Sequence, residues 1–134
     1  MVFEFISEGY KGEISKIVKF SETSLGGMYN LAFGDKKVGK EEIDDTVVSN
    51  NGDSEKVLAT VVDAVYAFTE YHPDTWVYAT GSTKARTRLY RMGITKYYEE
   101  IIQDFVIFGF FDGEWVDFKK DVDYTAFIVK RKSN

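Results

Sequence analysis

The clearest pattern in this chain is a stretch in which apolar side chains recur at every third or fourth position. This spacing places them on one face and predicts an amphipathic helix over residues 54–71. The apolar positions are Val57, Leu58, Val61, Val62, Val65 and Phe68. Asp53 ends a turn-forming Asn-Asn-Gly-Asp stretch and is expected to cap the helix, which His72-Pro73 ends.

Stretches rich in β-branched and aromatic residues precede this helix. Residues 13–22 and 28–33 lie on either side of a Gly-Gly pair and predict two strands joined by a hairpin loop. A short third strand is expected over residues 46–49, after an acidic stretch.

The middle of the chain predicts a strand followed by a second helix. Residues 76–80 are the strand, and the small-residue turn at 81–83 supplies a serine or threonine cap for the helix. Gly93 is expected to end this helix. The residues expected on its buried side are Ala85, Leu89 and Met92. A further helical or turn-rich stretch is expected over residues 95–104.

The last part of the chain predicts further strands. Residues 105–111 and 114–118 lie on either side of Asp-Gly, a strong hairpin signal, and residues 124–130 close the sheet. The main elements, in the order β-β-β-α-β-α-β-β, predict an α+β fold with a single mixed, mostly antiparallel sheet and two main helices. With 134 residues, 44% of them hydrophobic, residues 1–134 are expected to form one domain.

Composition narrows the possible functions. The chain has no cysteine, which excludes disulfides, a thiolate nucleophile and cysteine metal ligands. No apolar run approaches the roughly 20 residues of a membrane span, so we expect a cytoplasmic protein without a membrane partner. The net charge of -5 argues against general nucleic-acid binding, although a local basic patch can still bind a nucleic acid.

A basic stretch gives the strongest indication of chemistry. Arg86, Arg88 and Arg91 are three of the four arginines, and no acidic residue lies between Asp74 and Glu99. A helix that begins after a small-residue turn presents unpaired backbone N–H groups, which together with arginine side chains favour an anion such as phosphate. The candidate ligand-binding residues are Gly81, Ser82, Thr83, Arg86, Arg88 and Tyr90.

The helical wheel divides the basic residues between two flanks. Lys84, Arg88 and Arg91 share one flank, and Arg86 and Tyr90 share the other. We expect Lys84 and Arg91 to contribute less to anion binding, because one lies at the edge of the first turn and the other beyond it. Arg86→Ala and Arg88→Ala are expected to keep the fold and to weaken anion binding.

Other candidate sites have less support. His72, the only histidine, is expected to interact with the last carbonyls of the first helix, and it has no partner at catalytic spacing. The carboxylates Asp44, Asp45 and Asp53 match no calcium-binding loop, and no Walker, G-x-S-x-G or G-x-G-x-x-G motif occurs. We therefore expect no metal site and no cofactor, and we assign no catalytic residue. Tyr90 is expected to pack, although a phenol there can also act as an acid or stack on a base.

Three segments resemble a family of small bacterial proteins that have no assigned function. They are residues 30–35 (NLAFGD), 49–53 (SNNGD) and 81–90 (GSTKARTRLY). The similarity extends over nearly the whole chain. It implies that these segments matter to the family, and it implies no activity.

A fainter likeness is to the GNAT N-acetyltransferase superfamily, whose later part runs strand, pyrophosphate-binding turn, helix, strand, helix and two strands. Residues 52–58 (GDSEKVL) stand where that family has its Q/R-x-x-G-x-G/A turn. Residues 85–94 (ARTRLYRMGI) are similar to the family's later helix, which carries an alanine, a tyrosine and a Gly-Phe pair. Asp53 would place a negative charge where that family holds pyrophosphate. The likeness therefore implies a degenerate GNAT-like sheet and gives no support to acetyl-CoA chemistry.

The sequence as a whole predicts an intracellular protein that binds a nucleotide, a phosphorylated metabolite or a short nucleic acid at residues 81–88. An enzyme, either a diverged acyltransferase or a small nuclease-like toxin, and a protein-interaction module are the alternatives. An acyltransferase needs a pantetheine-sized cleft between strands, a nuclease needs converging arginine and tyrosine side chains, and an interaction module needs only a convex basic face. The arginines would have no binding role if they paired with the carboxylates of residues 41–55. The oligomeric state stays open.

Overall fold

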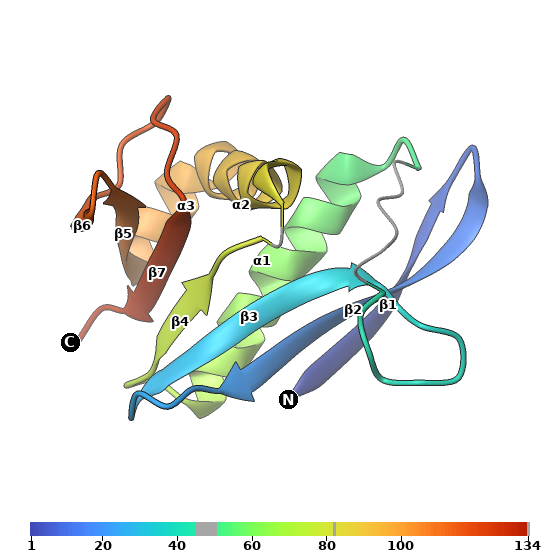
Figure 1. Ribbon diagram of the computed structural model, residues 1–134, viewed down its shortest axis with the longest axis horizontal. Coiled ribbons are helices and arrows are strands. Elements are labelled where there is room, and N and C mark those ends of the chain that lie inside the picture. Colours follow the sequence, from blue (N-terminus) through green and yellow to red (C-terminus); the bar gives the residue numbers. More distant parts are fainter. Residues whose placement is uncertain (45–50, 82, 134) are drawn as a thin grey trace.

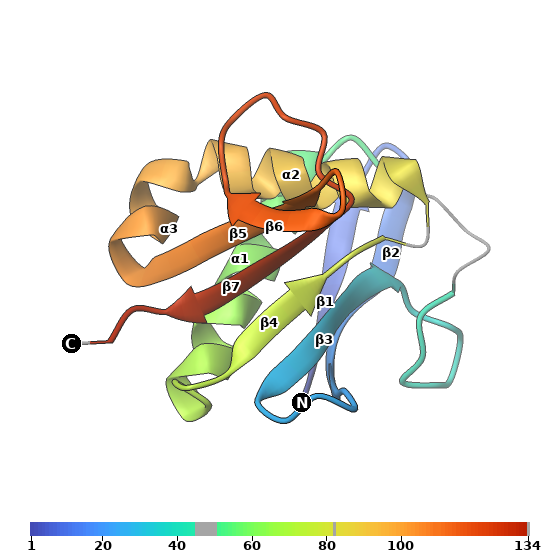
Figure 2. The ribbon, with the colours of Figure 1, turned by 60° about the vertical axis from the view of Figure 1, so that its left-hand side comes forward.

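In the computed structural model, which describes residues 1–44, 51–81 and 83–133, seven strands form one sheet and three helices pack against one of its faces (Figures 1 and 2). The strands are β1 (Val2–Gly9), β2 (Gly12–Glu22), β3 (Met28–Asp35), β4 (Trp76–Ala79), β5 (Phe105–Phe111), β6 (Glu114–Asp117) and β7 (Ala126–Arg131). The helices are α1 (Ser54–Tyr71), α2 (Lys84–Lys96) and α3 (Tyr98–Asp104). The predicted α+β class with a single mixed sheet is confirmed.

The order of strands across the sheet is β1-β2-β3-β4-β7-β5-β6. β3 and β4 are parallel, and all other neighbouring strands are antiparallel. Because parallel strands need a crossover connection, α1 lies between them in the chain. The β3–β4 pairing begins at Met28 and Trp76 and ends at Leu31 and Ala79, whereas β3 continues to Asp35 beside β2. The two parallel strands therefore separate at the end of β4.

Alternate residues of the central strands point towards the helices and form the core. Leu31, Val77 and Phe127 lie on this side of three neighbouring strands, and each of them is buried. Phe68 of α1 stacks on Phe20 of β2 with 4.2 Å between the ring centroids. This packing holds α1 against the sheet.

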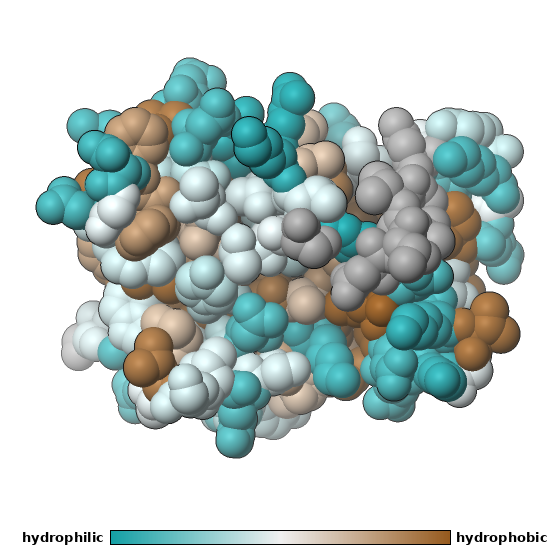
Figure 3. All heavy atoms as spheres, in the orientation of Figure 1, coloured by the Kyte–Doolittle hydropathy of each residue, from teal (hydrophilic) through white to brown (hydrophobic). Residues whose placement is uncertain are grey.

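The opposite face of the sheet is turned towards the viewer in Figure 1, where β3 crosses in front of α1. Figure 3 shows the same side with dark hydrophilic residues along the upper rim, over α2, and paler residues below them. No helix of the described residues covers this face. Its side chains therefore meet solvent or a partner.

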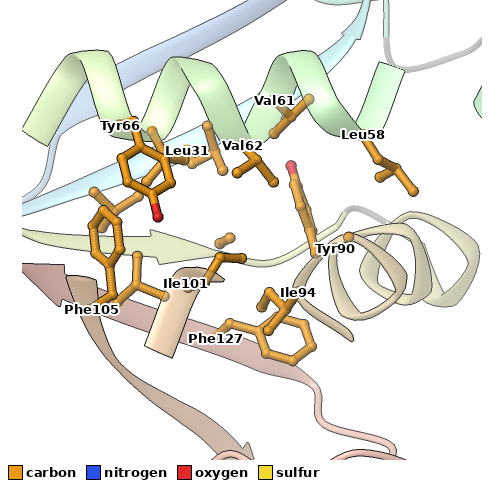
Figure 4. Close-up of a pocket in the computed structure, with 15 residues that line it drawn as sticks. Leu31, Leu58, Val61, Val62, Tyr66, Tyr90, Ile94, Ile101, Phe105 and Phe127 are labelled. Carbon is orange, nitrogen blue, oxygen red and sulfur yellow. The ribbon is translucent and has the colours of Figure 1, made fainter. Parts of the chain in front are cut away.

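A small apolar cavity lies between α1, α2 and the sheet (Figure 4). Its volume is about 70 Å³, and Leu58, Phe105 and Phe127 are among the residues that line it. The ring of Tyr90 extends from α2 towards α1 at one end of the cavity. The space is smaller than the cavity of about 150 Å³ that takes up benzene in another protein.

The first helix has the predicted bounds, but Asp53 does not cap it through its side chain. The Asp53 carboxylate instead accepts hydrogen bonds from the Ser7 hydroxyl at 2.7 Å and from the Glu8 N–H at 3.1 Å. Neighbouring Asn51 is buried, and its amide donates to the Gly12 carbonyl at 2.9 Å. These bonds attach the β1–β2 hairpin to the start of α1. The strand expected over residues 46–49 lies outside the described residues.

The predicted buried side of α2 is only partly correct. Leu89 is half-buried and packs against the core, but Ala85 and Met92 are exposed, and the buried residues of this helix are Arg86, Tyr90 and Gly93. The apolar pattern predicts that Arg86 is exposed, because arginine is a polar residue. In the structure Arg86 is buried, so the buried side of α2 is rotated about the helix axis relative to the predicted side.

Gly93 does not end α2, which continues to Lys96. A Cβ at Gly93 would lie 3.3 Å from Cδ2 of Leu58, so the glycine allows α2 to approach α1 closely. The same residue that is typical of a helix end is here a contact residue between two helices.

We expect Leu58→Ala to lower the free energy of unfolding by about 2 to 5 kcal/mol. Leu58 is 5% exposed and borders the existing cavity, so its removal enlarges a space that neighbouring side chains already leave unfilled. Denaturant unfolding measures the change, with Lys56→Ala on the exposed side of the same helix as a control. A loss below about 0.5 kcal/mol, as is usual for surface substitutions, would contradict this description of the core.

Candidate functional site

The start of α2 is held by a short network of hydrogen bonds. The Thr83 hydroxyl oxygen accepts a bond from the Arg86 N–H at 3.2 Å, which confirms the predicted threonine cap. The Thr87 hydroxyl accepts a bond from the Gly81 N–H at 3.0 Å and donates to the Thr83 carbonyl at 3.2 Å. The Gly81 N–H, an expected anion donor, is therefore already bonded within the protein.

Gly81 has a packing role at this turn. A Cβ there would lie 2.5 Å from Cβ of Arg86 and 2.5 Å from the Thr87 nitrogen. No other residue fits this close passage of the chain against the first turn of α2. Gly81 thus shapes the site without contributing its own N–H group to it.

A cleft of about 700 Å³ lies between α2 and the segment that enters β7. Thr83, Lys84, Arg88 and Arg91 line its α2 side. Gly81 lies at the end of β4, and the far side consists of Asp123, Tyr124 and Thr125. The structure therefore brings together three of the predicted ligand-binding residues, Gly81, Thr83 and Arg88. Ser82 lies outside the described residues.

The charged side chains of this cleft are mostly positive. Three cationic residues and one carboxylate line it, which leaves an excess of two positive charges. Arg91 pairs with Asp123 and also donates to the Val122 carbonyl at 3.4 Å. Among the described residues, neither Lys84 nor Arg88 has an ion-pair partner.

The hydroxyl groups of the cleft already bond to the protein. The Thr80 hydroxyl donates to the Thr125 carbonyl at 2.8 Å, and the Thr125 hydroxyl donates to the Phe110 carbonyl at 3.3 Å. The Tyr124 hydroxyl accepts a bond from the Lys119 N–H at 2.9 Å. A ligand would therefore be held mainly by the cationic side chains.

Arg86 points away from this cleft and into the protein. It is 8% exposed, and its Nη1 donates to the Phe33 carbonyl at 2.6 Å, beyond the point where β4 has separated from β3. A Cβ at Gly34 would lie 2.5 Å from Nη1, so this glycine makes room for the guanidinium. Arg86 and Tyr90 line a separate space of about 130 Å³. The two flanks predicted from the helical wheel thus face two different places.

Tyr90 belongs to the core. Its ring packs edge-to-face on Phe33 with 5.4 Å between the centroids, and 7% of the residue is exposed. Burial raises the pKa of Tyr90 to about 12, although a backbone hydrogen bond from Phe33 and the charge of Arg86 act in the opposite direction. A phenol with this pKa keeps its proton near neutral pH, so Tyr90 is poorly suited to proton transfer.

Two acidic residues of segment 41–55 and His72, which are also candidates from the sequence, make contacts outside the cleft. Glu42 pairs with Lys37, and Glu55 pairs with Lys96, so these two carboxylates of the acidic segment do not pair with the arginines of α2. His72 stacks on Phe68 with 4.8 Å between the ring centroids. Its backbone N–H donates to the Phe68 carbonyl at 3.0 Å. Both contacts place His72 at the end of α1, as its position before proline predicts.

Within residues 1–44, 51–81 and 83–133, no group of three or more histidine, aspartate or glutamate residues is placed to hold a metal ion. In the same residues, no helix combines the length and apolar character needed to cross a membrane.

The fold and the cleft define an α+β protein with a one-sided sheet and a basic site at the start of its second helix. The chain belongs to a family of unknown function (DUF6934), whose model matches residues 1–132. No curated protein and no solved structure matches the chain.

The far side of the cleft is not apparent from the sequence. Asp123 and Thr125 lie 27 and 29 residues after Lys96, the last residue of α2, and come close to the helix only because β7 pairs with β4. The helical wheel places Lys84 and Arg91 on the flank of Arg88, and all three line the cleft, whereas Arg86 lines the separate space. The smaller contribution of Lys84 and Arg91 to anion binding stays a prediction.

We expect Arg86→Ala to lower the free energy of unfolding by about 1 to 3 kcal/mol, because the buried Phe33 carbonyl loses a charged donor. Arg88→Ala should change it by less than about 0.5 kcal/mol, because Arg88 is exposed. Chemical denaturation of both variants measures the difference. Equal stability of the two variants would show that the Phe33 bond contributes little.

We expect Tyr90 to be among the last tyrosines to ionise, at about pH 12, together with Tyr66, whose pKa burial and Asp104 raise to a similar value. The fold favours the neutral phenol. The stabilisation is therefore complete below the ordinary pKa of 10.0 and is lost as the pH rises towards about 12. Ultraviolet titration of tyrosinate measures this, and Tyr90→Phe should remove one late-ionising group. A Tyr90 that ionises with the exposed tyrosines would contradict its burial.

Proposed function

We propose that this protein binds a phosphate-bearing ligand in the cleft between α2 and the start of β7. The observation that carries the proposal is the convergence of Lys84, Arg88 and Arg91 on one concave space with a single carboxylate. A volume of about 700 Å³ also lies within the range of about 300 to 1,000 Å³ typical of small-molecule sites.

The three cations have different roles in this proposal. The Arg88 guanidinium offers two parallel N–H groups to one phosphate, and the Lys84 ammonium acts as a flexible point charge near the first turn. The N-terminal end of α2, a helix of 13 residues, adds roughly half a positive charge on the same side. The ligand would therefore bind with its phosphate towards the start of α2.

Arg91 is the adjustable member of the group. Its partner Asp123 has a side chain that is 92% exposed, and exposed ion pairs contribute at most about 1 kcal/mol. A phosphate can therefore replace this carboxylate at little cost. Asp123 in turn would limit anion affinity while no ligand is bound.

The alternatives have less support. A pantetheine cleft would lie between β3 and β4, where the space of about 130 Å³ is bordered by Arg86. A nuclease-like site needs arginine and a free tyrosine hydroxyl to converge. Tyr124 lines the cleft with Arg88 and Arg91, but it is 5% exposed and its hydroxyl already bonds to the Lys119 N–H, while Tyr90 is buried on the other flank of α2. A GNAT-like origin of the sheet keeps some support from the parallel β3–β4 pair that α1 connects. An interaction module would present a convex basic face, but the basic flank of α2 lines a concave space.

We expect Arg88→Gln to weaken the binding of inorganic pyrophosphate by about 1.5 to 3 kcal/mol, the typical contribution of a hydrogen bond to a charged group. Isothermal titration calorimetry measures the affinity. Lys56→Gln is the matched control, since Lys56 is an exposed cation on α1, outside the cleft. An equal effect of the two substitutions would mean that only the overall charge matters.

Asp123→Asn gives the opposite test at the same site. It removes the competing carboxylate while keeping the size of the side chain, so pyrophosphate should bind more tightly, by up to about 1 kcal/mol. Weaker binding by this variant would argue against an anion in the cleft.

A further inference from the structure

Five aromatic side chains point outward from the sheet, on the face opposite the helices. They are Trp76 and Tyr78 of β4, Phe108 and Phe110 of β5, and Trp115 of β6. We call this surface the aromatic face. Their neighbours Val77 and Ala79 point to the core, so strand alternation places the five rings on the side that no described helix covers.

The rings hold one another in place across β7. Trp76 lies 5.9 Å from Phe108, and Tyr78 lies 6.1 Å from Trp115, measured between ring centroids. Phe110 lies 5.0 Å from Trp115. The smaller Ile128 of β7 is 9% exposed although no helix covers it, which fits rings that close over this strand. The result is an ordered set of flat surfaces.

Packing alone does not account for the whole surface. Trp115 is 40% exposed, and the other four rings are partly exposed. Lys130 lies on this face with its Nζ 5.6 Å from the centre of the Trp76 ring, and Asp117 is the acidic residue beside Trp115. An exposed group of aromatic rings of this kind is typical of a binding surface.

The aromatic face leads into the basic cleft. Tyr78 and Thr80 are two residues apart at the end of β4, a separation of about 7 Å in an extended chain, and Thr80 lines the cleft. In Figure 3, hydrophilic residues over α2 lie above paler residues of the sheet face. The aromatic face therefore adjoins the cleft, in which Lys84 and Arg88 have no ion-pair partner among the described residues.

We propose that the ligand is a short single strand of nucleic acid, with phosphates in the cleft and bases stacked on the aromatic face. This inference rests on the proposed phosphate binding. A single strand presents phosphates and unstacked bases side by side, and aromatic rings stack on any base. A duplex keeps its bases stacked internally and offers the rings nothing. The net charge of -5 confines binding to this local surface.

A second copy of the chain fits this surface less well. In a two-fold dimer the same patch lies on both sides of the interface. The rims that carry Lys84 and Arg88 would then contribute like charges to one interface. Charge complementarity therefore favours a polyanion.

The test is fluorescence anisotropy with a labelled single-stranded oligonucleotide of about ten nucleotides, within the usual range of site sizes. Tyr78→Leu and Trp115→Leu keep apolar bulk and remove the flat ring, and each should weaken binding by about 5- to 150-fold. Tyr71→Leu is the matched control, because Tyr71 is an exposed tyrosine at the end of α1. If Tyr78→Leu does not fold, the more exposed Trp115 still provides the test.

Salt dependence separates the two halves of the surface. Arg88→Gln should reduce the slope of log affinity against log salt by about 0.7, whereas Trp115→Leu should leave the slope unchanged. Trp115→Leu should also bind pyrophosphate as tightly as the wild type. Each of these results supports a division between phosphate and base contacts.

Three outcomes would overturn the proposal. If pyrophosphate binds but the oligonucleotide does not, phosphate binding stands and the nucleic acid is wrong. If neither binds, both proposals fail. If Trp115→Leu converts a dimer into a monomer in sedimentation and leaves oligonucleotide affinity unchanged, the aromatic face is an interface between two copies of this chain.

Discussion

The Phe33 carbonyl sets the orientation of the second helix. Once β4 separates from β3, this carbonyl needs a donor from outside the sheet, and the buried Arg86 guanidinium provides one. With Arg86 turned inward, helical geometry also turns Tyr90 inward and turns Lys84 and Arg88 outward. The cleft is therefore positively charged because Arg86 turns inward to bond to the edge of β3 beyond the end of β4, and this leaves Lys84 and Arg88 on the outer side of α2. Gly34 and Gly81 permit this arrangement, because a side chain at either position would collide with Arg86.

The sequence predicted the elements that depend on the pattern of neighbouring residues. It did not predict features that depend on a contact with a residue far away in the chain. The bounds of α1 follow from its regular apolar spacing and the His-Pro that ends it, and the Asp-Gly turn located the β5–β6 hairpin. The face of α2 could not be predicted from apolar residues, because its orientation depends on a carbonyl 53 residues away in the chain. The strand Val2–Gly9 was missed, although valine, isoleucine and two phenylalanine residues within positions 2–6 were a usable strand signal.

The two halves of the proposed binding surface differ in what the sequence reveals about them. The basic half is contiguous in sequence, so its cations could be grouped before the fold was known. The aromatic half comes from β4, β5 and β6, and its rings meet only because β7 inserts between β4 and β5. The carboxylate Asp123 is likewise brought to the cleft by β7. The order of strands in the sheet thus brings these residues together, and the pattern of residues along the chain does not reveal that order.

The apolar cavity between α1, α2 and the sheet has a consequence for the response of the protein to hydrostatic pressure. Water gains no hydrogen bonds in a space lined by Leu58, Phe105 and Phe127, so an apolar cavity of this kind stays dry while the protein is folded. Unfolding eliminates the void and lowers the volume of the system. Compression therefore shifts the equilibrium towards the unfolded chain, and a core that tolerates this gap loses stability under pressure sooner than a fully packed one.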